Sequence, residues 1–134
     1  YNNKEIYFYK LAQLLTSDIL HIKELLNKEK VDYTHLVGCA DYKIPQTLRA
    51  LNILEYNEEL SNIVDNKILI DENSKYEVEI RANMIEVITY ISSNLKDFSA
   101  IDINDYFFLN FAKNKVAPLY KSKRCKQRKR RKAK

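Results

Sequence analysis

The sequence is poor in the residues that build turns and loops. One glycine and two prolines occur among 134 residues. Tight hairpins favour glycine, and so do the loops that cradle phosphate groups, so neither feature is predicted here. The length suits about one domain with a single core. We therefore expect one compact, mostly helical domain.

Cysteine is also scarce. Cys39 and Cys125 lie far apart, and neither has further candidate ligands at metal-binding spacing. Neither a disulfide framework nor a zinc site is predicted, and we expect reduced thiols, no metal and no cofactor. No apolar run approaches the roughly 18 residues of a membrane span, and no signal-peptide pattern is present. These absences predict a soluble, cytoplasmic protein without a membrane partner.

Charge is distributed unevenly along the chain. Residues 113–134 hold 12 basic and no acidic residues, which leaves 11 basic and 18 acidic residues in the rest. We interpret residues 1–120 as the folded domain and residues 121–134 as a disordered basic tail. The tail can contact nucleic-acid phosphates or act as a nuclear address, but it has no aromatic residue after Tyr120 to stack on bases, so direct nucleic-acid binding is not favoured.

Apolar periodicity and capping residues predict five helices. They are expected over residues 5–27, 45–51, 58–65, 74 to about 94, and 105–114. Pro45 suits a first helical turn, Asn52 a stop, and Asn57 a cap. Ser74 stands three residues before Glu77 in a capping-box arrangement. Asp102 or Asn104 is expected to cap the last helix, and the stretch 31–43 is interpreted as a loop.

Asp41 is the first candidate for chemistry, because it lies directly ahead of the helix that Pro45 begins. A carboxylate there can also simply cap the helix. Lys10 can be a surface lysine whose stem covers apolar neighbours. Glu79 and Arg81 are two apart, so they do not face each other on a helix. Gln13 and Gln46 are amides among apolar residues, able to bind the backbone or a ligand. His21 and His35 lack partners at metal or triad spacing.

Four strings carry a family resemblance. FYKLAQLLTSDIL, ADYKIPQTLRALNILEYNEEL, YEVEIRANMI and DYFFLNFAK occur in this order. In sequence and separation they resemble the C-terminal half of the queuosine salvage protein family, over about residues 6–120. Members are queuosine 5'-phosphate N-glycosylases, whose fold is similar to that of helical DNA glycosylases. The resemblance implies an all-α enzyme that hydrolyses queuosine 5'-monophosphate and releases queuine for tRNA modification.

The resemblance also implies roles for individual residues. Asp41 matches the family's ADY string and is expected to stabilise the oxocarbenium-like sugar or to activate water. Lys10 of the FYK string is the second catalytic candidate, either binding phosphate or ribose or keeping Asp41 ionised. The expected substrate-binding residues are Tyr42, Gln46, Arg81, Glu79, Lys121 and Lys123. Two alternatives stay open: an inactive remnant of the family, and a nucleic-acid module that uses the basic tail.

Overall fold

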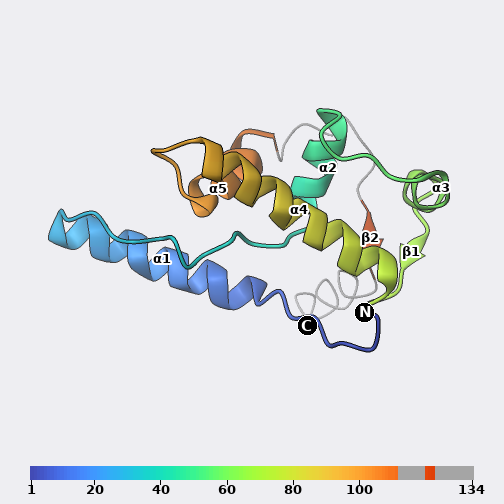
Figure 1. The fold of residues 1–134 in the computed structure, drawn as a ribbon, viewed down its shortest axis with the longest axis horizontal. Helices are drawn as coiled ribbons and strands as arrows, with labels where there is room; N and C mark the ends of the chain where they lie inside the picture. Colours follow the sequence, from blue (N-terminus) through green and yellow to red (C-terminus); the bar gives the residue numbers. More distant parts are fainter. Residues whose placement is uncertain (112–119, 123–134) are drawn as a thin grey trace, which may run out of the picture.

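Helices dominate the computed structural model, as the scarcity of turn residues predicted. The structure describes residues 1–111 and 120–122. Within them the elements follow the order α1 (Lys10–Asn27), α2 (Lys43–Ala50), α3 (Glu58–Asp65), β1 (Leu69–Ile70), α4 (Lys75–Asn94), α5 (Ala100–Phe111) and β2 (Lys121–Ser122) (Figure 1). The all-α class is confirmed, since the two short strands in these residues form a single parallel pair.

The caps predicted for α3 and α4 are present. Asn57 Oδ1 accepts a hydrogen bond from the Leu60 N–H at 2.8 Å. Ser74 Oγ accepts one from the Glu77 N–H at 3.4 Å. Glu77 departs from the usual capping box, because its carboxylate accepts from the Asn73 N–H at 2.7 Å. Both helices therefore begin where side chains satisfy otherwise unpaired backbone N–H groups.

The predicted start of the first helix at residue 5 is wrong. Tyr9, directly before α1, has φ 44° and lies in the left-handed region, so the helix cannot extend back through it. The apolar period runs on through Ile6, which is why the sequence pattern misplaced the boundary. Residues 5–9 instead form an irregular approach to Lys10.

The predicted start of the last helix is also wrong, since α5 begins at Ala100. Ser99 and Asp102 form a reciprocal capping box, in which the Ser99 N–H donates to Asp102 Oδ2 at 2.8 Å and the Asp102 N–H donates to Ser99 Oγ at 3.3 Å. Asp102 is therefore the third residue of the helix and not its cap. The end expected at residue 114 lies outside the described residues.

Helix α2 begins two residues before the predicted start, so Pro45 occupies its third position. Its end is as expected. Asn52 has φ 54°, the Asn52 N–H donates to the Arg49 carbonyl, and the Ile53 N–H donates to the Leu48 carbonyl. This pattern is a Schellman motif, which satisfies the last carbonyls of a helix.

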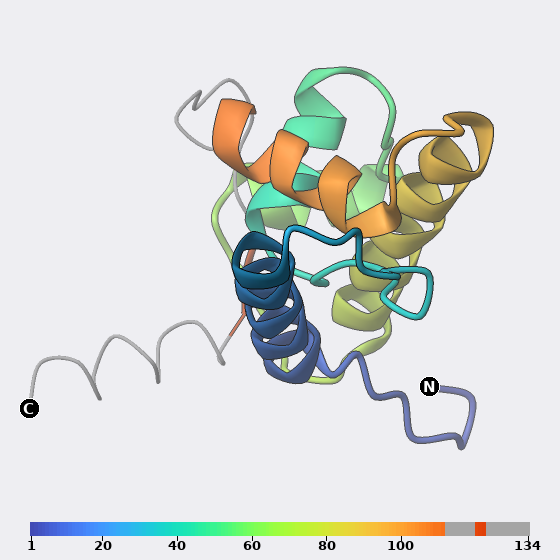
Figure 2. The same cartoon turned by 90° about the vertical axis from the view of Figure 1, so that its left-hand side faces the viewer.

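The main core lies where α2, α4 and α5 pack against one another (Figure 2). It is made of Ala40, Ile44, Leu48, Leu54, Met84, Ile88, Ile103 and Phe107. A second cluster beneath α3 and β1 contains Leu60, Val64, Ile70, Ile80 and Tyr120. Burial of these apolar side chains is the main source of stability, at about 1.5–3 kcal/mol for each large one.

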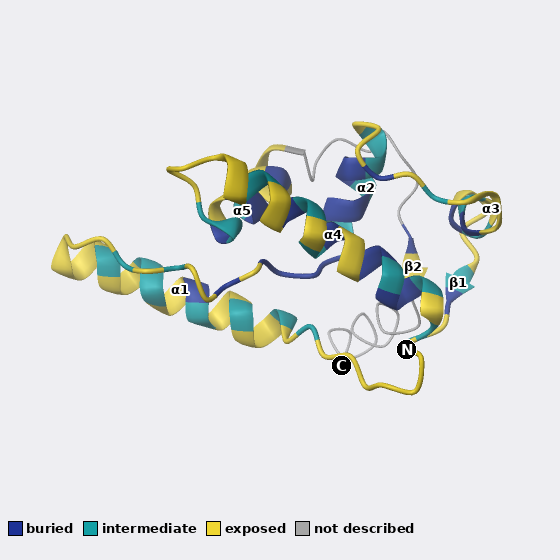
Figure 3. Ribbon diagram, viewed as in Figure 1, coloured by how far each residue is buried: buried dark blue, intermediate teal, exposed yellow. Residues whose placement is uncertain are grey.

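Helix α1 stands apart from this core. It extends along one side of the molecule, and Ser17 is its buried residue (Figure 3). Seven large apolar side chains of α1 are exposed to solvent: Leu11, Leu14, Leu15, Ile19, Ile22, Leu25 and Leu26. After α1 the chain returns beside the helix and becomes buried as it approaches α2 (Figure 3). The polar side of α1 therefore faces this returning loop.

The assignment of residues 121–134 to a disordered tail needs correction at its first two residues. Lys121 and Ser122 form β2 and pair with Leu69 and Ile70 of β1. Tyr120, directly before them, is buried in the second cluster. Burial of this ring brings the backbone beside β1, which explains the pairing. Residues 123–134 lie outside the described part.

Candidate active site

Asp41 is buried at the junction between the returning loop and α2. Its Oδ1 accepts hydrogen bonds from the Lys43 N–H at 2.5 Å and from the Ile44 N–H at 3.2 Å. The capping interpretation is therefore correct for Oδ1. It does not account for the second carboxylate oxygen, Oδ2.

That oxygen binds Lys10, the first residue of α1. Lys10 Nζ donates to Asp41 Oδ2 at 2.9 Å, across a separation of 31 residues in the sequence. The lysine side chain is 22% exposed and the aspartate side chain 6%. The structure thus brings the two predicted catalytic residues into one ion pair that remains accessible from the lysine side.

Tyr42 lies beside this pair, directly before α2, and Gln46 lies on α2. Lys10 Nζ is 5.7 Å from the centroid of the Tyr42 ring, within the range of a cation–π contact. Tyr42 also packs against the second apolar cluster. Gln46 is half-buried one turn further along α2. Both remain predictions as substrate-binding residues, and Tyr42 is the one seen in contact with Lys10.

Arg81 takes part in a buried arrangement on α4. Its Nη1 lies 4.0 Å from Glu77 Oε1, and both side chains are buried. The guanidinium carbon lies 4.3 Å from the centroid of the Phe8 ring, and Phe8 precedes Lys10 by two residues. Because guanidinium groups stack well on aromatic rings, Arg81 supports the segment that leads into α1. Sequence reasoning missed this role of Phe8, although Phe8 is part of the FYK string.

Glu79 is directed elsewhere on α4. It accepts a hydrogen bond from the Tyr1 hydroxyl at 2.8 Å and lies 3.9 Å from Lys75 Nζ. The prediction that Glu79 and Arg81 do not pair agrees with these contacts. The structure does not bring Glu79 to the Lys10–Asp41 pair.

The structure describes one of the two basic residues that were predicted to bind substrate phosphate. Lys121 is an exposed residue of β2 whose backbone pairs with Leu69. Lys123 lies outside the described residues. Nothing in the geometry links Lys121 to Asp41, so its role as a phosphate ligand remains a prediction.

Asn104 binds the loop that leads to Asp41, whereas the sequence indicated it only as a possible cap. It lies buried on α5, and its Oδ1 accepts from the Cys39 N–H at 2.9 Å. Burial raises the pKa of the Cys39 thiol to about 11, although the Lys10 ammonium acts in the opposite direction. Cys39 is therefore a neutral core thiol next to the site and not a nucleophile at neutral pH.

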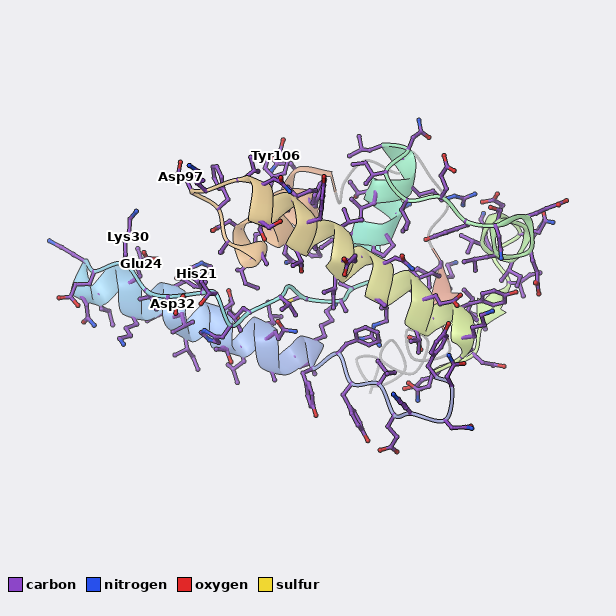
Figure 4. All side chains as sticks on the ribbon, viewed as in Figure 1. His21, Glu24, Lys30, Asp32, Asp97 and Tyr106 are labelled. Carbon is purple, nitrogen blue, oxygen red and sulfur yellow. The ribbon has the colours of Figure 1, made fainter. Side chains whose placement is uncertain are left out.

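His21 lies on α1 and packs against Tyr33 of the returning loop. Its ring centroid is 5.1 Å from that of Tyr33, and the Tyr33 hydroxyl donates to Glu24 at 3.0 Å. Figure 4 shows His21 and Glu24 on the part of α1 that lies beside the returning loop, near Asp32. This contact ties the far half of α1 to the loop.

Two hollows in the described surface lie elsewhere. One, of about 340 Å³, is lined by Lys23, Asn27, Glu29, Lys30, Val31, Asp32 and His35. A second, of about 500 Å³, is lined by Asn57, Glu58, Glu59 and Asn62. Neither includes Lys10 or Asp41. Across residues 1–111 and 120–122, no three His, Cys, Asp or Glu side chains come close enough together to hold a metal ion, and no helix is long and apolar enough to span a membrane.

The fold and the ion pair define a helical domain in which a lysine and a buried aspartate meet where two helices begin. The sequence model of the family described as "Queuosine salvage protein" matches residues 1–128, and the chain belongs to that family. The family prediction made from the four strings is thereby confirmed.

Curated relatives give the same result. The chain is 36% identical over 89 residues to a queuosine 5'-phosphate N-glycosylase/hydrolase of Dictyostelium discoideum, covering 66% of this chain and 28% of the relative. It is 32% identical over 131 residues to the protein of that name from Nematostella vectensis, covering 84% and 38%. For the Schizosaccharomyces pombe protein the identity is 32% over 124 residues, covering 90% and 36%. The chain spans about a third of the length of these relatives.

Proposed function

We propose that this chain takes part in hydrolysis of the N-glycosidic bond of queuosine 5'-monophosphate, with release of queuine, and that Asp41 and Lys10 are its catalytic residues. The single observation that carries the proposal is their ion pair, formed between the two strings that resemble the family. The relatives are named for this activity. We further propose a cytoplasmic location and the nucleotide as the small-molecule partner.

The chemistry of the bond explains why a fixed carboxylate is useful. As the base departs, positive charge develops on the ribose, and a preorganised anion nearby lowers the free energy of that state. A carboxylate offers about four lone-pair positions. Asp41 uses three of them, for the Lys43 N–H, the Ile44 N–H and Lys10. As far as the contacts among residues 1–111 and 120–122 go, one position is left for the attacking water or a ribose hydroxyl.

Lys10 holds the other side of the carboxylate. Its ammonium has three N–H donors, and one of them binds Asp41 Oδ2. The 22% exposure of this side chain leaves it accessible to the ribose or phosphate of the substrate. Tyr42, next to Asp41, offers a ring face against which a planar base can stack.

Queuine release tests the proposal directly. The purified chain is incubated with queuosine 5'-monophosphate, alongside Asp41→Asn, Lys10→Met and a matched control, Arg49→Met. Arg49 forms a bidentate ion pair with Asp65, away from the proposed chemistry. Release that disappears in Asp41→Asn and persists in Arg49→Met supports the proposal. The absence of release from the folded 134-residue chain would contradict it for this chain on its own.

The basic tail gives a second measurement. Deletion of residues 123–134 leaves β2 in place. Loss of queuine release from a chain that stays folded would make the tail part of the phosphate site. Unchanged release, together with loss of a salt-dependent affinity for RNA, would assign the tail to nucleic-acid contact instead.

A further inference from the structure

Gln13 uses both ends of its side-chain amide to join two segments of the chain. It lies in the first turn of α1 and is half-buried. Its Oε1 accepts from the Val37 N–H at 2.9 Å, and its Nε2 donates to the Phe8 carbonyl at 3.3 Å. One amide group thus bridges the approach to α1 and the loop that returns from it.

These two backbone positions lie close in sequence to the proposed catalytic residues. Phe8 precedes Lys10 by two residues, and Val37 precedes Asp41 by four. The loop around Val37 has no helix or strand to fix it. Side-chain amides bind it instead: Gln13 holds the Val37 N–H, and Asn104 holds the Cys39 N–H. Arg81 supports Phe8 from the α4 side.

We propose that Gln13 is a positioning residue for the Lys10–Asp41 pair. It touches neither reacting group, and it sets their separation by fixing the two backbone segments that carry them. This inference rests on the proposed function for its catalytic meaning. Displacement of a catalytic group by about 1 Å can lower the rate about a hundredfold. Loss of the Gln13 hydrogen bonds to both segments is therefore expected to have a large effect on turnover.

A double-mutant cycle tests the inference without any need for turnover. The urea midpoint of unfolding is measured for the whole chain, Gln13→Met, Lys10→Met and the double variant. Methionine has a similar length to glutamine and suits a helix, but it lacks the two hydrogen bonds. If Gln13 positions the ion pair, the midpoint shift caused by Lys10→Met falls to about half or less in the Gln13→Met background.

The matched control is Arg49→Met, which removes the separate Arg49–Asp65 ion pair. Its midpoint shift is expected to be the same in both backgrounds, because Gln13 contacts neither residue. An equal shift for Lys10→Met in both backgrounds would overturn the inference. If Gln13→Met does not fold, Gln13→Glu replaces it in the same cycle, since it keeps the shape and the acceptor for Val37 and loses the donor to Phe8.

Kinetics separate positioning from a general structural effect. With queuosine 5'-monophosphate, Gln13→Met is expected to lower kcat about 10- to 100-fold while KM changes little, at a temperature where the variant is fully folded. An unchanged kcat would overturn the catalytic meaning of the clamp. If the unsubstituted chain shows no turnover although the cycle shows coupling, the proposed function fails and the structural clamp stands, so the two failures are distinguishable.

Discussion

Asp41 performs two tasks with its two oxygens, and substitution can separate them. Oδ1 caps α2 through the Lys43 and Ile44 N–H groups, and Oδ2 binds Lys10. Asn is a good helix cap but carries no charge, so Asp41→Asn keeps the cap and loses the ion pair. Asp41→Ala loses both. The two variants are therefore expected to differ in the free energy of unfolding.

The magnitudes follow from burial. Removing one partner of a fully buried pair costs about 3–5 kcal/mol, and an exposed pair contributes about 0–1 kcal/mol. Lys10 is 22% exposed and can turn to solvent, so we expect Asp41→Asn to cost about 1–2 kcal/mol between those limits. Loss of a helix cap costs about 1 kcal/mol more, so Asp41→Ala is expected to cost about 2–3 kcal/mol.

Urea unfolding followed by circular dichroism measures both differences. Asp65→Asn is the control, because the Asp65 side chain is 46% exposed and loss of its charge is expected to lower the free energy of unfolding by less than about 1 kcal/mol. Equal stability of Asp41→Asn and Asp41→Ala would refute the capping role of Oδ1. An Asp41→Asn variant as stable as the original chain would refute the contribution of the Lys10 pair.

Three further predictions concern the core, the buried Cys39 thiol and the partly buried Tyr56. Leu48 is fully buried, so Leu48→Ala should lower the free energy of unfolding by about 2–5 kcal/mol, whereas Leu25→Ala at an exposed position should lower it by less than about 0.5 kcal/mol. Comparable losses for the two variants in urea unfolding would contradict the described packing. Because burial raises the pKa of Cys39 to about 11, iodoacetamide at pH 8 should label it far more slowly in the folded than in the urea-unfolded chain, as mass spectrometry of its peptide would show. Burial raises the pKa of Tyr56 from 10.0 to about 12, so its stabilising contribution is complete below pH 10 and is lost as the pH rises to 12; Tyr56→Phe should flatten that decline in stability, and an unaltered alkaline profile would count against it.

The exposed apolar side of α1 shows why a helix can be predicted without its packing. Its sequence has the spacing of an amphipathic helix, yet Leu25 and Leu26 are the most exposed of the large apolar side chains given for the described residues. Periodicity reports that a helix has an apolar side, but not what that side contacts. The part of the chain that the structure describes covers the polar side of α1 with the returning loop instead.

Local signals in the sequence determined much of this protein. Asn57 and Ser74 marked helix starts because their short polar side chains bind nearby N–H groups, and Asn52 marked an end because it tolerates a positive φ. Family strings indicated Lys10 and Asp41. The start of α5 was misplaced because the reciprocal partner of Asp102, Ser99, lies outside the apolar pattern.

Tertiary structure decided which of these residues meet. Lys10 and Asp41 are 31 residues apart, and no local rule predicts that the Lys10 ammonium reaches Oδ2 of Asp41. The same holds for the Gln13 bridge to Val37 and for the stacking of Arg81 on Phe8. The physical reason is that capping and periodicity act within a few residues of the chain, whereas an ion pair between distant segments depends on how the helices and the loop pack.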